Sequence, residues 1–307
     1  MSEYTIKAYE PGFEVEQEQI GIEVSSKWNW PFQSMLPTLK EMYSKDDFDP
    51  ETVQFCFKGK KMVGYVLARI GVQEGVVGPG LVVDEGLAAS LDYPRVLPEH
   101  EAAAELLMEK IITVLESKGV KLIQTRVTTM RENSIELAKK FGFKPHSDFP
   151  LGYKLYYEYD LNKGFLGYST ENVKAFNLER DIDTCSEKVA KFFKITEDNA
   201  KILIQEIDTN EELVSHLVIR NNGEMFGYSY ALPNDVRKDV IALYYIEAAT
   251  EDYLRELIVQ SVNRAIMKDG KTFIIDVVNE LLLFEFLYKE LGFTKVAKWG
   301  IFEKRIK

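Results

Sequence analysis

Apolar residues recur at helical spacing in two long segments of the chain. The first spans residues 99–118 and has its apolar positions at Leu106, Leu107, Ile111, Val114 and Leu115. The second has them at Leu254, Leu257, Ile258, Val262, Ala265 and Ile266. Spacings of three and four residues place each set on one face, so both segments are predicted to be amphipathic helices. Residues 34–44 and 184–206 are also expected to be helical.

Each long helix is followed by a glycine and then by an apolar run. Gly119 and Gly270 come after short charged turns, and glycine suits the left-handed position just past a helix end. The runs at 120–127 and 271–278 are predicted to be strands. Strands that alternate with helices predict an α/β layered architecture.

Similar phrases occur in both halves of the chain in the same order. Residues 57–68 and 219–231 each read as a β-hairpin with a glycine in the turn and a second strand that begins Met-x-Gly-Tyr. Residues 137–144 and 287–294 each read as a helix end, a glycine and a short strand. The offsets between the halves are 225 − 62 = 163 at the hairpins and 270 − 119 = 151 at the helix ends. The first half therefore carries 163 − 151 = 12 additional residues, which we place within 71–83.

The repeat predicts one α/β plan used twice. A chain of 307 residues is long enough for two domains, since typical domains run to about 100–200 residues. We place the domains at 1–162 and 163–307, with the boundary in the polar, glycine-bearing stretch 161–170. A chance similarity between two unrelated α/β domains is the alternative explanation.

Composition narrows the class of protein. The net charge is 38 − 49 = −11, which argues against a general nucleic-acid-binding role because an acidic chain repels phosphate backbones. Hydrophobic residues make up 46% of the chain, too much for a disordered protein. No apolar run approaches the ~20 residues of a membrane helix, so no membrane association is expected. The opening MSEYTIKAYE does not read as a secretory signal.

Cysteine and histidine usage narrows it further. The chain has two cysteines, Cys56 and Cys185, far apart in sequence. This pattern excludes a disulfide scaffold and fits a reducing cytoplasm. The three histidines form no pair at ligand spacing, so no metal site is expected.

The order of predicted elements, together with Leu-Tyr-Lys-Glu-Leu-Gly-Phe at 287–293, resembles the GNAT superfamily of N-acetyltransferases. The first half has Leu-Ala-Lys-Lys-Phe-Gly-Phe at 137–143. The resemblance covers nearly the whole chain, twice. It implies two tandem GNAT-like domains, each a central mixed sheet flanked by helices. It also implies acetyl transfer from acetyl-CoA to a small-molecule amine.

The resemblance assigns catalytic roles to two residues. In the family a tyrosine near the end of the later helix protonates the departing thiolate, and Tyr288 matches it, whereas Ala138 stands there in the first half. A family carboxylate on or near the fourth strand acts as the base, and Glu247 matches it. Asp92 and Tyr93 are the first-half candidates. Packing of Tyr288 in an apolar helix and solvation of Glu247 are the structural alternatives.

The family binds the acyl-CoA pyrophosphate on backbone N–H groups at the start of the long helix. The resemblance therefore implies cofactor contacts at Val96, Leu97, His100, Ala102, Ile246, Ala248, Ala249 and Thr250. Neither half carries the family's Arg/Gln-x-x-Gly-x-Gly/Ala loop. Pro98 instead reads as a first helical residue, and Thr250 as an N-cap followed by Glu251 and Asp252. Acidic residues there stabilise the helix dipole and oppose a phosphate.

Two functional hypotheses follow. The first is an acetyl-CoA-dependent N-acetyltransferase, with the second half as the better catalytic candidate and a cationic amine favoured by the acidic chain. The second is a non-catalytic GNAT-like binding or regulatory protein that has lost CoA binding in one or both domains. In the family the segment between the first two helices often lines the acceptor site, and Trp28, Trp30 and Phe32 match that segment. They either line the acceptor site, where their rings suit an amine, or pack in the core.

Overall fold

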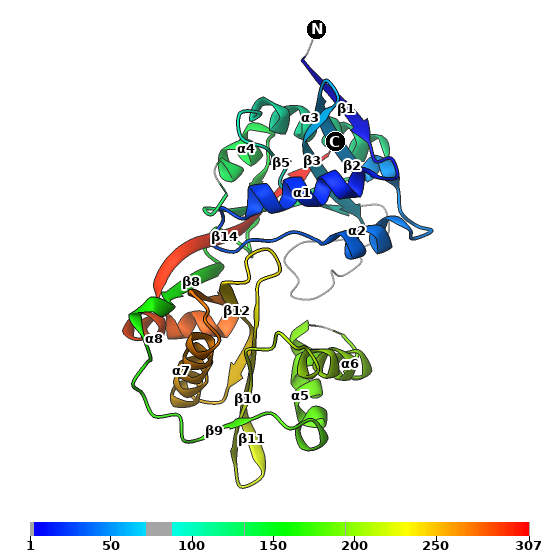
Figure 1. Cartoon of the computed structure of the whole chain (residues 1–307). Coiled ribbons are helices and arrows are strands. Elements are labelled where there is room, and N and C mark those ends of the chain that lie inside the picture. The colour runs from blue at the N-terminus through cyan, green and yellow to red at the C-terminus, as the bar shows by residue number, and fades with distance from the viewer. Residues whose placement is uncertain (1–2, 72–87, 132, 194, 307) are drawn as a thin grey trace. The chain divides into compact units, whose positions relative to one another are not determined.

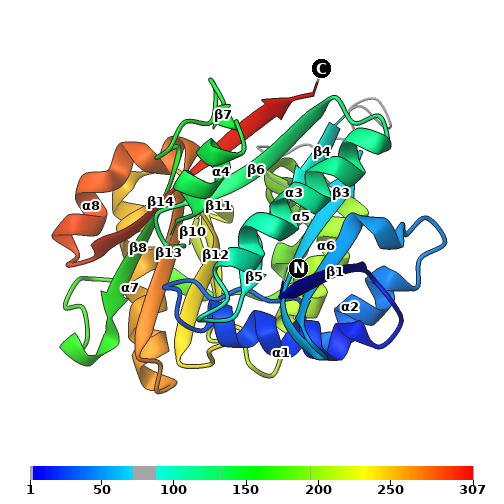
Figure 2. The same cartoon turned by 90° about the horizontal axis from the view of Figure 1, so that it is seen from above.

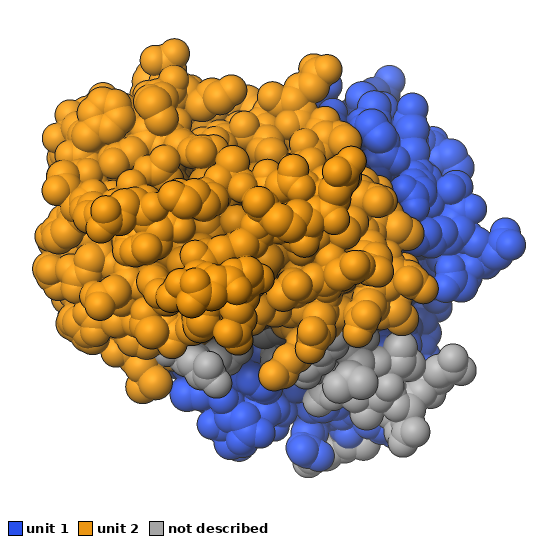
Figure 3. Space-filling view, turned by 90° about the horizontal axis from the view of Figure 1, so that it is seen from below, with its two compact units in different colours: residues 1–76, 80–153, 298–307 blue, residues 77–79, 154–297 orange. Residues whose placement is uncertain are grey.

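The computed structural model describes residues 3–71, 88–131, 133–193 and 195–306. These residues form two compact units, which carry different colours in Figure 3. Unit 1 contains the described residues up to Tyr153 and those from Lys298 onward, and unit 2 contains those from Lys154 to Ala297. The units therefore divide the chain at other positions than the predicted ranges, because the chain leaves unit 1 after Tyr153 and returns to it at Lys298.

Unit 1 is a mixed sheet with helices on both faces (Figures 1 and 2). Its elements are β1 (Tyr4–Ala8), α1 (Phe13–Ser25), α2 (Leu36–Tyr43), the short 3₁₀ helix η1 (Pro50–Thr52), β2 (Val53–Lys58), β3 (Lys61–Ile70), β4 (Ala88–Leu91), β5 (Arg95–Val96), α3 (Ala102–Ser117), β6 (Leu122–Thr128), α4 (Ser134–Lys140), β7 (Lys144–Pro145) and the final part of β14 (Thr294–Arg305).

The sheet of unit 1 has the strand order β1-β2-β3-β4-β6-β14. Neighbouring strands are antiparallel except for β4 and β6, which run parallel. Ile20 of α1 and Leu39 of α2 pack against one face of the sheet. Leu107 of α3 and Leu137 of α4 pack against the other. The core of unit 1 therefore lies in two layers, one on each side of the sheet.

Unit 2 repeats this plan with its own set of elements. They are β8 (Lys154–Asp160), η2 (Leu161–Lys163), β9 (Val173–Ala175), α5 (Leu178–Phe193), α6 (Glu197–Asp208), β10 (Ser215–Asn221), β11 (Glu224–Pro233), β12 (Val240–Ala248), α7 (Glu251–Met267), β13 (Thr272–Val278), η3 (Asn279–Phe284), α8 (Glu285–Glu290) and the start of β14.

The sheet of unit 2 has the strand order β9-β10-β11-β12-β13-β8, and again a single pair, β12 and β13, runs parallel. Cys185 of α5 and Ile204 of α6 pack on one face, and Leu257 of α7 packs on the other. Each unit thus has a helix pair, a hairpin, a further strand, a long helix and a strand parallel to the one before that helix. This match confirms the predicted repeat and the predicted α/β class.

Most predicted elements are confirmed. The long helices are α3 and α7, and the strands that follow them are β6 and β13. The hairpin turns contain Gly59 and Gly223, with φ angles of 63° and 86° that favour glycine. Helix α1 was not among the predicted elements, and its buried residues include Glu14 and Gln17, so its apolar pattern is weak.

Residues 184–206 are helical as predicted, with a break: α5 ends at Phe193, and Thr196 caps α6 by accepting a hydrogen bond from the Asn199 N–H at 3.2 Å. Two local predictions are wrong. Pro98 does not begin a helix, since α3 starts at Ala102. Asp269, and not Gly270, takes the left-handed conformation after α7.

Gly270 is required because its neighbours leave no room for a side chain. A Cβ atom at this position would lie 2.8 Å from Cγ1 of Ile241 and 2.9 Å from Cδ1 of Leu161. The glycine therefore permits close packing of the turn after α7. The predicted additional stretch at 71–83 lies, apart from Gly71, outside the described residues.

Candidate functional site

Two parallel strands of unit 1 part company where the shorter one, β4, ends. β4 and β6 are in register from Ala88 opposite Leu122 to Leu91 opposite Thr125. Beyond Leu91 the chain continues along β3, where Val96 pairs with Gly64. β6 continues to Thr128 in its pairing with β14. Because the two strands then follow different partners, a gap opens between them on the side where α3 begins.

A β-bulge and a glycine set this course. On β3 the step from Tyr65 to Ala68 is 68 − 65 = 3 residues, whereas the paired step from Leu91 to Arg95 is 95 − 91 = 4. One extra residue in a strand bends it and increases its twist. A Cβ atom on Gly64 would lie 2.8 Å from the Arg95 carbonyl oxygen. The glycine of Met-x-Gly-Tyr therefore allows β5 to approach β3.

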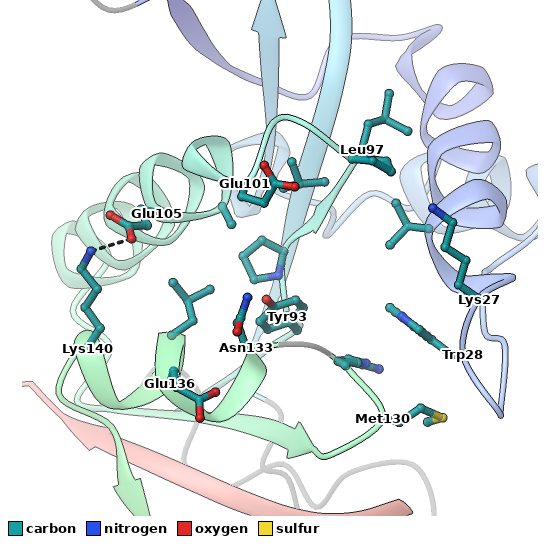
Figure 4. A pocket seen from close by; sticks show the side chains of 17 residues that line it. Lys27, Trp28, Tyr93, Leu97, Glu101, Glu105, Met130, Asn133, Glu136 and Lys140 are labelled. Carbon is teal, nitrogen blue, oxygen red and sulfur yellow. Dashed lines mark hydrogen bonds and ion pairs between the residues drawn. The ribbon is translucent and has the colours of Figure 1, made fainter. Parts of the chain in front are cut away.

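The gap holds a cleft of about 750 Å³ (Figure 4). This volume is within the range of small-molecule sites, roughly 300–1,000 Å³. The cleft is lined by Val24, Lys27, Trp28, Tyr93, Pro94, Val96, Leu97, Pro98, Glu101, Ala104, Glu105, Met130, Arg131, Asn133, Glu136, Leu137 and Lys140. All of these residues belong to unit 1, and they come mainly from the end of α1, the β5 segment, α3 and α4.

The loop between β5 and α3 forms one wall of the cleft. The His100 N–H donates to the Leu97 carbonyl oxygen at 3.2 Å, with Pro98 second in the turn and Glu99 third at a φ of 69°. This is the pattern of a type II turn. The Glu99 N–H donates to Oε1 of Glu101 at 3.1 Å. The Glu101 carboxylate thus accepts a hydrogen bond from a backbone N–H group that a phosphate bound at this loop would use.

Charges of opposite sign line different parts of the cleft. Glu101 and Glu105 are at the start of α3, and Glu105 forms an ion pair of 2.5 Å with Lys140 of α4. Lys27 and Trp28 lie on the opposite side in Figure 4. The Arg131 guanidinium carbon is 4.6 Å from the Trp28 ring centre. The cleft is therefore acidic toward α3 and basic around Trp28.

The cleft includes two of the four cofactor residues predicted in the first half. Val96 and Leu97 line it. His100 instead has its Nδ1 atom 3.0 Å from the Tyr4 hydroxyl, and Ala102 is the first residue of α3. Neither is among the lining residues. Of the three predicted aromatic residues, Trp28 lines the cleft.

Sequence reasoning did not single out the lining residues that follow α1, follow β6 or belong to α4. They include Lys27, Met130, Asn133, Glu136 and Lys140. Their position follows from the strand β6 that precedes α4, so the predicted strand at 120–127 was the available signal. Its register against β4 is a matter of tertiary structure.

The cofactor residues predicted in the second half lie at a tighter junction. β12 ends at Ala248 and α7 begins at Glu251, so only Ala249 and Thr250 connect them. Thr250 Oγ1 accepts a hydrogen bond from the Tyr253 N–H at 3.3 Å, which confirms the predicted N-cap. Ile246 is buried.

Acidic residues surround this helix start. Glu251 forms an ion pair with Arg255 at 2.9 Å, and Arg255 forms another with Glu290 at 2.5 Å. These contacts occupy Arg255, so its guanidinium is already paired with carboxylates at this helix start. The junction therefore offers a well-capped helix and no loop comparable to the one before α3.

Glu247, the predicted base, is engaged by two neighbours. Its Oε1 atom accepts from Lys188 at 2.5 Å and its Oε2 atom accepts from the Tyr245 hydroxyl at 2.7 Å. Its neighbour Ala248 pairs with Gly227 as Val96 pairs with Gly64 in unit 1, so the counterpart of Glu247 is Arg95.

Tyr288, the predicted acid, is fully buried in the core of unit 2. Its ring stacks on Tyr157 at 5.3 Å between centroids, and its hydroxyl has no hydrogen-bond partner in the described part of the chain. Burial raises the pKa of Tyr288 above its usual value. The proposed roles of Tyr288 and Glu247 stay predictions.

Other classes of site find little support in the described residues. No group of three His, Cys, Asp or Glu side chains among them is placed to hold a metal ion. None of the helices in these ranges combines the length and apolar character that crossing a membrane requires.

No protein-family model and no curated protein sequence matches the chain. Solved structures do match it. A GCN5-related N-acetyltransferase from Sphaerobacter thermophilus has a TM-score of 0.68 at 10% identity, with 100% of this chain and 97% of that chain covered. A GNAT-family acetyltransferase from Colwellia psychrerythraea has a TM-score of 0.66 at 16% identity, with coverages of 98% and 100%.

A third similar structure is a tandem GNAT protein from the clavulanic acid biosynthesis pathway. Its TM-score is 0.62 at 11% identity, and 98% of each chain is covered. Matches over whole chains show that this chain has the tandem GNAT fold. They confirm the fold that the sequence resemblance implied.

Proposed function

We propose that the chain is an acyl-CoA-dependent N-acetyltransferase whose acyl-CoA binds in the cleft of unit 1. One observation carries this proposal: β4 and β6 separate beside the start of the long helix α3, and the gap is hollow. A helix start presents backbone N–H groups without intrahelical partners, which suit an anion such as a pyrophosphate. The names of the similar structures support acetyl transfer as the reaction.

The cleft fits an acyl-CoA in part. Trp28, Pro94, Val96 and Met130 give it apolar walls suited to the uncharged arm of such a molecule. The loop before α3 fits less well, because the Glu101 carboxylate accepts the Glu99 N–H. Binding of the phosphates at this loop requires Glu101 to release that amide.

Tyr93 takes the role of proton donor in this proposal. It is the one tyrosine among the described residues that line the cleft, and Figure 4 shows it between the α3 side and the Trp28 side. A phenol there protonates the departing thiolate of acetyl-CoA when an amine attacks the thioester. In unit 1 Ala138 leaves the family's tyrosine position without a hydroxyl.

A small-molecule amine is the proposed acceptor and the cytoplasm the proposed compartment. Acetyl transfer within an enclosed cleft depends on holding the amine against the thioester. Cys56 and Cys185 are both free and buried, which agrees with a reducing compartment.

A non-catalytic binding protein is the second candidate. The acidic loop in unit 1 and the sealed hydroxyl of Tyr288 in unit 2 both favour it. In that case the cleft binds a ligand and no acetyl group is transferred.

Thermal unfolding with acetyl-CoA separates the two candidates. Acetyl-CoA at about 100 times its Kd should stabilise the folded chain by ~2.7 kcal/mol. Thiol release with a panel of amines then reports transfer. A chain that binds acetyl-CoA without transfer to any amine would be the binding protein.

A pair of variants on α3 locates the site. Ala104→Trp places a large ring in the cleft and should abolish the stabilisation by acetyl-CoA. Glu109→Trp puts the same ring on an exposed position of the same helix and should leave it unchanged. If both variants keep the full effect, acetyl-CoA binds outside unit 1's cleft.

A further inference from the structure

Arg95 is a buried cation beside the cleft. Arg95 is only 6% exposed and is not itself a lining residue, although its chain neighbours Pro94 and Val96 are. Its guanidinium is connected to the cleft through the lining residue Trp28, whose ring centre is 5.6 Å away. Nη1 of Arg95 donates to Oε1 of Gln33 and, at 2.9 Å, to the Tyr65 hydroxyl. Both acceptors are uncharged. The guanidinium is thus held in place by neutral groups.

No carboxylate among the described residues pairs with Arg95. Asp92 is close enough to affect the pKa of Tyr65, but its ion-pair contact is with Arg69 at 3.9 Å. Burial raises the pKa of Tyr65, so this phenol stays neutral and supplies no negative charge. A buried charge without a counter-ion is costly, and in folded proteins it is normally paired.

The network around Arg95 is built for this arrangement. The Gln33 amide donates from Nε2 to the Ser34 carbonyl oxygen at 2.8 Å, which turns its oxygen toward Arg95. A Cβ atom on Gly21 would lie 1.8 Å from that oxygen and 2.7 Å from the Tyr65 hydroxyl. Gly21 therefore leaves room for both acceptors.

Part of the guanidinium remains available. A guanidinium has five N–H donors. The two acceptors both contact Nη1, and the structure gives Nε and Nη2 no acceptor in the described part of the chain. Among the described residues, no atom of Arg95 is both fully buried from solvent and without a hydrogen-bond partner, whereas the Tyr288 hydroxyl is. The unused N–H groups are therefore open to a ligand.

Aromatic rings frame this position. The Arg95 guanidinium carbon is 5.6 Å from the ring centres of both Trp28 and Phe32. Trp28 lines the cleft, and Arg131 approaches the same indole at 4.6 Å. Two guanidinium groups near one ring, with Lys27 on the same side, raise the local positive potential.

We infer that Arg95 binds a carboxylate of the ligand. A planar guanidinium with free N–H groups on one edge matches a carboxylate in bidentate geometry. This inference deepens the proposed function and rests on it for the substrate class: the acceptor is an amine that also carries a carboxylate, and its amine is presented to the thioester. It revises the expectation that an acidic chain favours a purely cationic acceptor.

The test follows acetate binding to the full chain through arginine Nε–H signals in NMR spectra. The Arg95 signal is the one that disappears in Arg95→Gln. We expect it to shift saturably with acetate, and about ten-fold less tightly with acetamide, the uncharged isostere. Arg69→Gln removes an exposed arginine of the same unit and should leave acetate binding unchanged. No shift with acetate, or equal shifts with both probes, overturns the inference.

Stability separates a binding role from a packing role. If Arg95 has no counter-ion until a ligand binds, Arg95→Gln should melt at the same or a higher temperature than the parent chain. The substitution removes an unpaired buried charge. Arg95→Lys keeps the charge without the bidentate edge and should bind acetate more weakly while remaining folded. A lowered melting temperature in both variants, with acetate binding retained in Arg95→Lys at the parent affinity, overturns the inference.

A phosphate of acetyl-CoA is the other source of an anion. Arg95→Gln should keep the thermal stabilisation by acetyl-CoA, and pyrophosphate should not displace acetate from the parent chain. If acetyl-CoA binding is lost with Arg95, the anion belongs to the donor and the acceptor carboxylate is refuted. If the parent chain binds acetate at Arg95 but shows no response to acetyl-CoA, the proposed function fails while the carboxylate site stands.

Discussion

The two units share one plan and differ where a ligand would bind. In unit 1 five residues, 97–101, connect the strand to the long helix, whereas in unit 2 two residues, 249 and 250, do so. Arg95 in unit 1 stands where unit 2 has Glu247, and Ala138 stands where unit 2 has Tyr288.

Each unit therefore has a different part of the site that the sequence resemblance led us to expect. Unit 1 has the hollow gap and a loop before its helix but lacks the tyrosine. Unit 2 has the tyrosine and the carboxylate, but Tyr288 is sealed in the core and Glu247 is ion-paired with Lys188. The sequence motifs and the open cleft therefore point to different units.

The largest expected effect comes from removing the hydroxyl group of each candidate tyrosine in turn. Tyr93→Phe should lower acetyl transfer by ~10²–10⁴-fold because it removes the proton donor of the cleft. Tyr288→Phe should leave turnover unchanged, since its hydroxyl is buried in the core of unit 2. Steady-state thiol release measures both. The opposite result would place the chemistry in unit 2.

The next effect is a pH dependence confined to unit 2. His216 has Nδ1 2.9 Å from Asp208 and Nε2 2.8 Å from the Tyr228 hydroxyl. Burial lowers its pKa to about 4 in spite of Asp208. Its counterpart in unit 1 is Val53, which pairs with Leu67 as His216 pairs with Tyr230.

The direction of this pH dependence follows from comparing the folded and unfolded states of His216. Unfolded His216 takes up a proton below about pH 6.5, whereas folded His216 stays neutral to about pH 4. Unit 2 should therefore lose up to about 3 kcal/mol of stability as the pH falls between these values. Amide hydrogen exchange on β10 measures this loss of stability, with the amides of β2 in unit 1 as the reference. His216→Asn should remove this contribution, and an unchanged slope in that variant would refute it.

A smaller contrast separates the two motif glycines. A Cβ atom on Gly64 would meet the backbone oxygen of Arg95 at 2.8 Å, whereas on Gly227 the nearest atom is Cδ1 of Leu257 at 2.9 Å. Backbone moves less readily than the end of a side chain. Gly64→Ala should cost about 2 kcal/mol and Gly227→Ala about 1 kcal/mol.

Fluorescence helps to measure this contrast. All three tryptophans, Trp28, Trp30 and Trp299, belong to unit 1, so denaturation followed by their emission reports Gly64→Ala. Hydrogen exchange on β11 reports Gly227→Ala. Equal costs in the two variants would mean that β5 yields as easily as Leu257.

The smallest effect concerns the acidic helix starts. Glu101→Gln should tighten acetyl-CoA binding about 3-fold, because it removes a charge from the loop of unit 1. Glu251→Gln at the start of α7 should leave the affinity unchanged. Titration calorimetry measures both, and an affinity gain in the second variant alone would shift the binding site to unit 2.

The sequence was sufficient for elements that local patterns define. The spacing of Leu254, Leu257 and Ile258 predicts α7, and the Met-x-Gly-Tyr phrases predict the two hairpins that β2, β3, β10 and β11 form. Helix α1 escaped prediction because its buried face contains Glu14 and Gln17.

The site could not be predicted in the same way, because it depends on strand pairing that local sequence patterns do not specify. The offset between the halves changes from 163 at the hairpins to 151 at the helix ends, so the strand between them has no fixed alignment in sequence. Only the observed pairing of Val96 with Gly64 and of Ala248 with Gly227 matches Arg95 to Glu247. The bulge after Leu91 adds the residue that places Arg95 opposite Tyr65.

The last strand has a consequence for how the protein is made. β6 of unit 1 pairs on one side with residues 299–305, while the strand that follows unit 1 in sequence, β8, pairs with β13 of unit 2. A ribosome that has released residues 1–162 has therefore not yet supplied the strand that completes the first sheet. Unit 1 can complete its sheet only after β14 has emerged, although every residue that lines the cleft is synthesised before unit 2.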